Sequence, residues 1–223
     1  MGMIKMNKLI VDSDDFVINN VEAELIINVD SVDITTTGNN KIFINKDTIN
    51  LNITLEDDST LELYIFSKNK IGDNRIVINQ GNNTSIVYKE SFVSSTNVTE
   101  YISNVIMGNN NKSDIKIRCI ANKDQVDLDV LIVALKDTFN NEAVEDIKGI
   151  NNGGTIKMLP NMEISSNEIE ANHYMTIGDI DKNYFFYLKS MGISEQKAKK
   201  LILNGFLKSI YKDTTIIGGE FIE

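Results

Sequence analysis

Hydrophobic and polar residues alternate along roughly the first two thirds of the chain. The period is two, and not the 3.6 residues of an amphipathic helix. Alternation of this kind predicts strands that bury one face. The alternating apolar positions are Ile42 and Ile44; Ile49, Leu51, Ile53 and Leu55; Leu61, Leu63 and Ile65; Ile76 and Ile78; Ile115, Ile117 and Cys119; and Val126, Leu128, Val130 and Ile132.

Turn-forming residues separate these runs. Gly and Asn adopt positive φ at little cost, and they gather at residues 38–40, 81–83, 108–111 and 151–154. Pro160 is the single proline, so nothing else in the sequence blocks backbone pairing. Many short strands with polar turns fit a β-sandwich, a barrel or a β-helix. The 29 asparagines favour the β-helix, where side-chain amides stack at repeated corners, although no hexapeptide repeat is visible.

The period changes near residue 180, where a helical hairpin is predicted. Asp181 can cap a helix over Lys182–Ser190, and Gly192 supplies a left-handed stop. Ser194 then caps a second helix, which we expect to run from Glu195 to Lys212. The division expected is a β domain over residues 1–178 and a helical domain over residues 179–223.

Two features of this hairpin predict a partner. Tyr184, Phe185, Phe186 and Tyr187 are too many aromatic residues for one face of a short helix, so part of the cluster should face another protein. Gly205 lies inside the second helix, next to Phe206, where glycine costs about 1 kcal/mol relative to alanine. We therefore expect another backbone to approach Gly205 closely.

Composition narrows the function classes. The chain has 223 residues and a net charge of −10, with no basic stripe to neutralise phosphates, so nucleic-acid binding is not expected. One cysteine excludes an internal disulfide and fits a reducing compartment. No apolar run approaches the ~20 residues of a membrane helix. A soluble cytoplasmic protein is the expectation.

Two residues are candidates for chemistry. His173, the sole histidine, alternates in phase with Ile169, Ala171, Met175 and Ile177, so it is either a core or interface histidine or a metal ligand. Cys119 shares a face with Ile115 and Ile117 and is either a small buried hydrophobe or a reactive thiol. Phosphate-loop, Cys-x-x-Cys and His-x-x-x-His motifs are absent from the sequence.

The C-terminal region carries six short elements in a fixed order. They are Pro160 to Ile164; Ile169 to His173; Ile177 and Gly178; Phe186 to Ile193; Ala198; and Gly205 with Phe206. In residues and in order they resemble the C-terminal signature of the SufB and SufD iron–sulfur cluster assembly scaffolds, and six ordered elements are more specific than one short motif.

The resemblance implies a right-handed parallel β-helix followed by a small helical domain. It also implies that a SufC-like ABC-type ATPase docks on the helical domain, at Tyr184, Phe185, Phe186, Tyr187, Gly205 and Phe206. Two scaffold subunits pair in the family, here as a homodimer, and a transient iron–sulfur cluster would assemble near their junction. His173 occupies the position of the family's strand histidine, and Cys119 is the second candidate ligand.

The sequence also departs from the family pattern. Tyr174 follows the histidine, where SufB has Glu and SufD typically has Gly, and Met191 replaces an expected Arg. The stretch that carries the SufB cluster cysteine is missing between Gly153 and Pro160. The chain thus resembles a short, single-scaffold version, and we expect no enzymatic activity. The alternatives are an interaction protein that binds the ATPase without a cluster and, further off, a β-helix carbohydrate-active enzyme.

Overall fold

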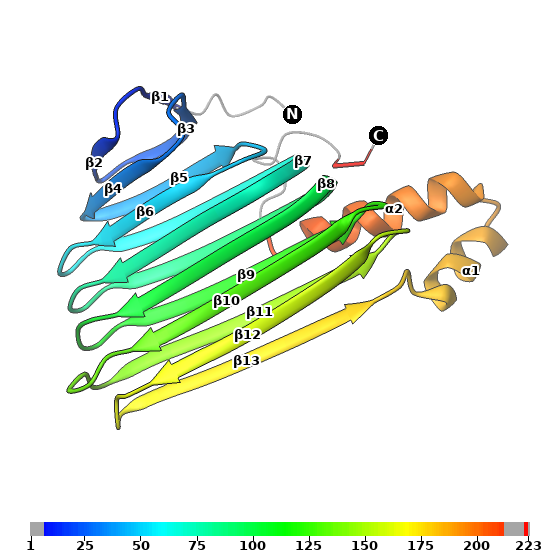
Figure 1. Cartoon of the computed structure of the whole chain (residues 1–223). Coiled ribbons are helices and arrows are strands. Elements are labelled where there is room, and N and C mark those ends of the chain that lie inside the picture. Colours follow the sequence, from blue (N-terminus) through cyan, green and yellow to red (C-terminus); the bar gives the residue numbers. More distant parts are fainter. Residues whose placement is uncertain (1–6, 212–220, 223) are drawn as a thin grey trace.

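The computed structural model describes residues 7–211, 221 and 222. Thirteen strands within these residues coil into a β-solenoid of about five turns, and every pair of neighbouring strands is parallel (Figure 1). The predicted parallel β-helix is confirmed. The strands are β1 (Asn7–Val11), β2 (Asp15–Asn19), β3 (Glu22–Ile27), β4 (Val32–Thr37), β5 (Asn39–Asn45), β6 (Asn50–Leu55), β7 (Thr60–Gln80), β8 (Ser85–Ile106), β9 (Lys112–Ala121), β10 (Gln125–Ala134), β11 (Asn141–Asn151), β12 (Thr155–Ile164) and β13 (Ile169–Gly178).

The solenoid has two long faces. One face follows the order β1-β3-β5-β7-β8-β9-β11-β13, and the other follows β2-β4-β6-β7-β8-β10-β12. The strands β7 and β8 belong to both faces because each continues through the bend without a break. The side chains that point inward from the two faces form one continuous apolar core, which explains the period of two along the sequence.

Asparagine ladders mark one corner of the coils. The Asn110 amide donates to Oδ1 of Asn83, 2.8 Å away, and the Asn140 amide donates to Oδ1 of Asn110 at the same distance. All three residues have positive φ, between 55° and 59°, which asparagine tolerates better than other non-glycine residues. The turns predicted from Gly and Asn are confirmed here.

The coils lengthen from the N-terminal to the C-terminal end. Ladder partners lie 19 residues apart at Asn20 and Asn39, 27 apart at Asn83 and Asn110, and 30 apart at Asn110 and Asn140. The increase follows the growth of the strands from five residues in β1 to ten in β10. A repeat of changing length has no fixed period, and a search for one in the sequence therefore finds none.

The two helices form the predicted hairpin. The first, α1 (Lys182–Ser190), begins at the N-cap Asp181, whose carboxylate accepts from the Asn183 backbone amide, and Gly192 follows it at φ +80°. The second, α2 (Glu195–Lys208), begins at the N-cap Ser194. It ends at Lys208, four residues before the predicted end; Lys212 itself lies outside the described residues.

The α2 helix packs on the outside of the solenoid, and α1 stands off beyond the end of β13 (Figure 1). The Ser91 hydroxyl donates to the Leu207 carbonyl at 2.7 Å, and the Tyr211 hydroxyl donates to the Ile65 carbonyl at 3.1 Å. The apolar contact between α2 and the solenoid joins Leu203, Leu207, Ile210, Tyr211 and Phe221 to Phe66, Val93, Ile120 and Ile150.

No helix in the described part of the chain is long and apolar enough to cross a bilayer.

Candidate functional site

The C-terminal end of the solenoid is open. Among the described strands, β12 pairs with β10 alone and β13 pairs with β11 alone, so each presents an unpaired backbone edge. Inward-phased apolar side chains at this end are exposed: Met175 by 46%, Ile164 by 40% and Ile177 by 36%. The next coil, which would cover them, has no counterpart in the described part of the chain.

His173 lies on this open end. It occupies the middle of β13, in the predicted phase with Ile169 and Ala171, and its side chain is exposed. We find no hydrogen bond or ion pair from its imidazole to any described residue. The exposed imidazole does not fit a core histidine, because β13 is the last described strand and nothing in the described chain packs on its inner face. The interface and the metal-ligand interpretations of His173 stay predictions.

Glu145 lies directly beneath His173. The register of β11 and β13 pairs Glu145 with His173, and the register of β9 and β11 pairs Glu145 with Ile115 on its other side. The Glu145 side chain is fully buried, and both of its carboxylate oxygens lack a hydrogen-bond partner among the described residues. Burial raises the pKa of this carboxyl to about 8.

The sequence contained a signal for Glu145 that the pattern analysis missed. Ala143, Glu145 and Ile147 alternate in one phase, and Ala143 and Ile147 are core residues. A carboxylate at an inward-facing position of a strand is costly to bury. Such a residue therefore either lowers the stability of the fold or binds a group that the strand does not supply. Glu145 and His173 are thus an oxygen donor and a nitrogen donor stacked on neighbouring strands.

The structure does not bring Cys119 to this place. Cys119 pairs with Gly149 of β11, whereas His173 pairs with Glu145, four residues earlier on that strand. From strand geometry, the Cα atoms of Cys119 and His173 lie about 13 Å apart along the strands and about 10 Å apart across them. Cys119 is fully buried, and burial, together with the carboxylates of Glu100 and Glu90, raises its pKa well above the usual range.

A second polar cluster surrounds Lys70 inside the solenoid. Nζ of Lys70 lies 2.7 Å from Oε1 of Glu90 and 3.0 Å from Oε1 of Glu100, and all three side chains are fully buried. The Tyr88 hydroxyl donates to the second oxygen of Glu90. Burial and the nearby Glu90 raise the pKa of Glu100 to about 8, although Lys70 opposes the rise. The sequence analysis did not predict this cluster.

The α1 aromatic residues are largely open to solvent. Tyr184, Phe186 and Tyr187 are 60–66% exposed, whereas Phe185 is half-buried and touches Phe186 edge-on, with ring centroids 6.2 Å apart. No residue of α1 is buried. Tyr184, Phe186 and Tyr187 are therefore free to contact another protein, as the sequence predicted for part of the aromatic cluster.

Gly205 and Phe206 differ from each other in their surroundings. Gly205 is exposed, and no described atom lies within 4 Å of the place where its Cβ would sit. The predicted close approach of another backbone is therefore wrong for contacts within the described chain. Phe206 is half-buried against the apolar contact between α2 and the solenoid.

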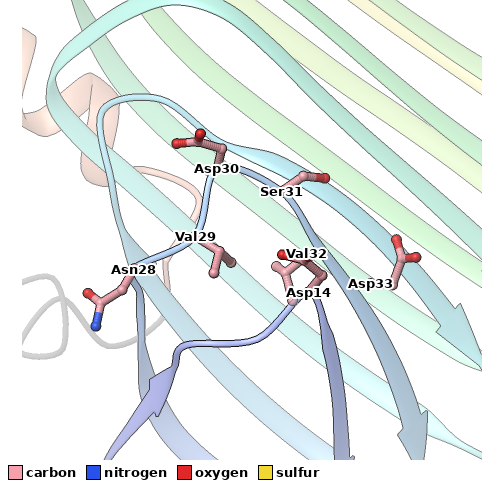
Figure 2. A pocket seen from close by; sticks show the side chains of 7 residues that line it. All are labelled: Asp14, Asn28, Val29, Asp30, Ser31, Val32 and Asp33. Carbon is pink, nitrogen blue, oxygen red and sulfur yellow. The ribbon is translucent and has the colours of Figure 1, made fainter.

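A hollow at the N-terminal end of the solenoid is the other feature of note. Asp14, Asp30 and Asp33 lie along it, but Figure 2 shows their carboxylates apart from one another and not gathered at one point. No group of three or more His, Cys, Asp or Glu residues that could hold a metal occurs within residues 7–211 and 221–222. A single described chain thus supplies at most the Glu145 and His173 pair at the open end.

Comparisons with known proteins point to the same part of the chain. Residues 149–206 match the family model for the SUF system iron–sulfur cluster assembly SufBD core domain, and this segment holds β12, β13, α1 and most of α2. An iron–sulfur cluster assembly protein SufD of Plasmodium falciparum is 40% identical over 62 residues, which are 27% of this chain and 4% of the relative. An iron–sulfur cluster assembly SufBD family protein of Pyrococcus horikoshii is 38% identical over 61 residues, 27% of this chain and 14% of the relative. SufD of Escherichia coli is 38% identical over 47 residues, 21% of this chain and 11% of the relative.

The fold and the site together define a parallel β-solenoid whose last described strand carries an exposed histidine. A helical hairpin follows this strand. The C-terminal segment that carries both features, residues 149–206, is similar to the SufB/SufD family. The aligned segments span 4–16% of the length of the first three relatives.

Proposed function

We propose that this protein is a scaffold and adaptor in iron–sulfur cluster assembly. The observation that carries the proposal is the match of residues 149–206 to the SufBD core domain, because this segment contains His173 and the hairpin. The relatives are named as assembly proteins, which fits a role without catalysis of its own. Iron and sulfide are cargo in this role.

Two copies of the chain would pair at the open C-terminal end. An unpaired strand edge with exposed apolar side chains needs a cover, and a second copy supplies one of matching chemistry. Of the two edges, β12 is the less suited to pairing, because Pro160 lacks a backbone donor and the exposed Lys157 and Glu163 carry charge. The homodimer would therefore form along β13.

A nascent cluster would be held at this junction, with His173 as a ligand. Imidazole can replace thiolate as a cluster ligand. Cys119 supports the site less well than the sequence indicated, because its thiol is buried, far from His173 and held in its protonated form. Free sulfide and the partner copy would then complete the ligands.

A SufC-like ABC-type ATPase would dock on the hairpin. Tyr184, Phe186 and Tyr187 offer aromatic side chains on a helix that contributes nothing to the core, and such residues dominate the binding energy of interfaces. A triple replacement of these residues by serine should abolish binding in calorimetry with the purified ATPase. The matched control, Phe139→Ser, removes an aromatic residue that is 48% exposed in a solenoid turn, and it should bind normally. Unchanged binding by the triple variant would refute the docking surface.

One alternative has support from the described residues. A protein that binds the ATPase without a cluster would need the hairpin but no ligands, and the separation of Cys119 from His173 favours this version. The two functions differ in one outcome: only the scaffold gains cluster absorption when it is supplied with iron and sulfide.

A further inference from the structure

The sequence contains two Asn-Gly pairs, and the structure holds them in opposite ways. They are Asn152–Gly153, in the turn between β11 and β12, and Asn204–Gly205, inside α2. Glycine has no Cβ, so its backbone nitrogen can come close to the side-chain carbonyl carbon of the asparagine before it. Such a pair can close a five-membered ring, and the surrounding structure decides whether it does.

Asn204 is locked by its surroundings. Its side-chain nitrogen donates to the carbonyl oxygens of Lys200 and Ile222, 3.0 and 3.1 Å away. Its side-chain oxygen accepts from the backbone nitrogens of Phe221 and Ile222, at 2.7 and 3.2 Å. The side chain is buried, and the pair lies within the helical backbone of α2. These hydrogen bonds would have to break before the ring could close.

Asn152 is held by much less. Its side-chain nitrogen makes one hydrogen bond, to Oδ1 of Asn122 at 3.0 Å, and its side-chain oxygen accepts none from the described residues. The backbone nitrogen of Gly153, which would attack the side chain, makes no hydrogen bond to a described residue. The turn lies at the surface, with Gly153 exposed at φ +92°. Surface turns open at a far lower cost than buried helix contacts do.

We propose that Asn152 is a site of spontaneous deamidation, with water as the co-reactant, and that Asn204 is protected from it. The Gly153 nitrogen bonds to Cγ of Asn152, the side-chain nitrogen leaves as ammonia with the proton of that backbone nitrogen, and a succinimide ring forms. Water then opens the ring at either carbonyl carbon, which gives aspartate or isoaspartate at position 152. Overall, one amide and one water become one carboxylate and one ammonium ion.

Either product would disturb the last coils of the solenoid. A carboxylate at position 152 cannot donate to Oδ1 of Asn122, and it brings a negative charge beside that oxygen. Isoaspartate also adds one atom to the main chain, in a turn that is tightly seated: a Cβ at Gly154 would lie 2.2 Å from the carbonyl oxygen of Asp124. The turn leads into β12 and β13, within the segment that matches the family model. The modification would therefore act on the coil that carries His173, whatever that coil binds.

The test is peptide mapping by mass spectrometry after the full chain has been kept for weeks at physiological temperature and pH. Trypsin gives one peptide over residues 149–157 and another over residues 201–208, so each pair is followed separately. In the folded protein Asn152 should lose its amide at least about tenfold faster than Asn204, because three further hydrogen bonds slow the reaction there by about tenfold to a thousandfold. In urea, where neither environment persists, the two pairs should react at similar rates.

Two variants test the consequence for the coil. Asn152→Asp carries the charge of the product and should lower Tm by about 2–8 °C. Asn167→Asp is the matched control, because it adds the same charge in the turn between β12 and β13, where the asparagine is exposed and makes no hydrogen bond to a described residue. It should melt as the parent does.

Two results would overturn the inference. If both pairs keep their amides equally in the folded protein and lose them in urea, the bond to Asn122 is enough to hold the turn closed, and Asn152 is not a deamidation site. If Asn152→Asp melts at the temperature of the parent and of Asn167→Asp, the reaction leaves the last coils undisturbed.

Discussion

Replacing Glu100 by glutamine should remove a large part of the pH dependence of folding stability. Glu100 shares Lys70 with Glu90 inside the solenoid, and Tyr88 and Cys119 border the same cluster. Its pKa is raised by burial and by Glu90, from 4.5 to about 8, so the folded protein binds a proton there that the unfolded chain has released. Stability contributed by this group is therefore present below about pH 4.5 and is lost as the pH rises toward 8.

The size of the effect follows from the shift. At about 1.4 kcal/mol per pKa unit, the rise of Glu100 corresponds to about 5 kcal/mol between pH 4.5 and pH 8. Glutamine keeps the shape of the side chain and an oxygen that can accept from Lys70, but it binds no proton. The variant should match the parent near pH 5 and exceed its stability by several kcal/mol near pH 8.5.

Urea unfolding at these two pH values measures the difference directly, as the change in the extrapolated free energy of unfolding. Glu145, whose pKa is also raised, titrates in both proteins, so its contribution cancels in the comparison. A difference between variant and parent that stays constant within about 1 kcal/mol from pH 5 to pH 8.5 would refute the reasoning. It would mean that Glu100 is ionised throughout and that Lys70 compensates both carboxylates.

Three further predictions concern the core and the corner of the solenoid. Gly108→Ala should lower Tm by about 2–10 °C in calorimetry, because the new Cβ would lie 2.5 Å from the carbonyl oxygen and 2.6 Å from the carbonyl carbon of Gly81; an unchanged Tm would contradict the packing of these two turns. Asn110→Ala should lower the free energy of unfolding by about 2–3 kcal/mol, through two lost ladder bonds and a positive φ, and Asn110→Gly should be milder; equal losses would exclude the role of φ. Cys119 should resist a thiol reagent in the folded protein and react in urea, since its thiol is buried and its pKa is raised; equal rates would place the thiol at the surface.

The strands could be predicted from sequence, because the side chains of both faces alternate between the core and the solvent. Ile115, Ile117, Val126, Leu128, Val130 and Ile132 are all buried, as their phase indicates. A period of two is common to sandwiches, barrels and helices, so the pattern alone left the architecture open. The resemblance near His173 selected the β-helix, since coils that grow from 19 to 30 residues leave no fixed repeat.

The polar interior was harder to predict. Lys70 lies at a register irregularity between β7 and β8, where alternation no longer tells which side chains point inward. Glu90 and Glu100 are partners across the solenoid interior, ten residues apart, and only the closed coil shows that both reach Lys70. His173 had the right phase, but its exposure depends on β13 being the last described strand, which no local pattern encodes.

Anaerobic reconstitution with iron and sulfide tests the central claim most directly. The parent protein should gain the visible absorption of an iron–sulfur cluster as a dimer. His173→Ala should fold and dimerise normally, because the imidazole makes no bond to the described chain, yet fail to gain that absorption. Cys119→Ser should still form the cluster at reduced yield. If His173→Ala reconstitutes as well as the parent while Cys119→Ser does not, the thiol carries the cluster and the site at the open end is wrong.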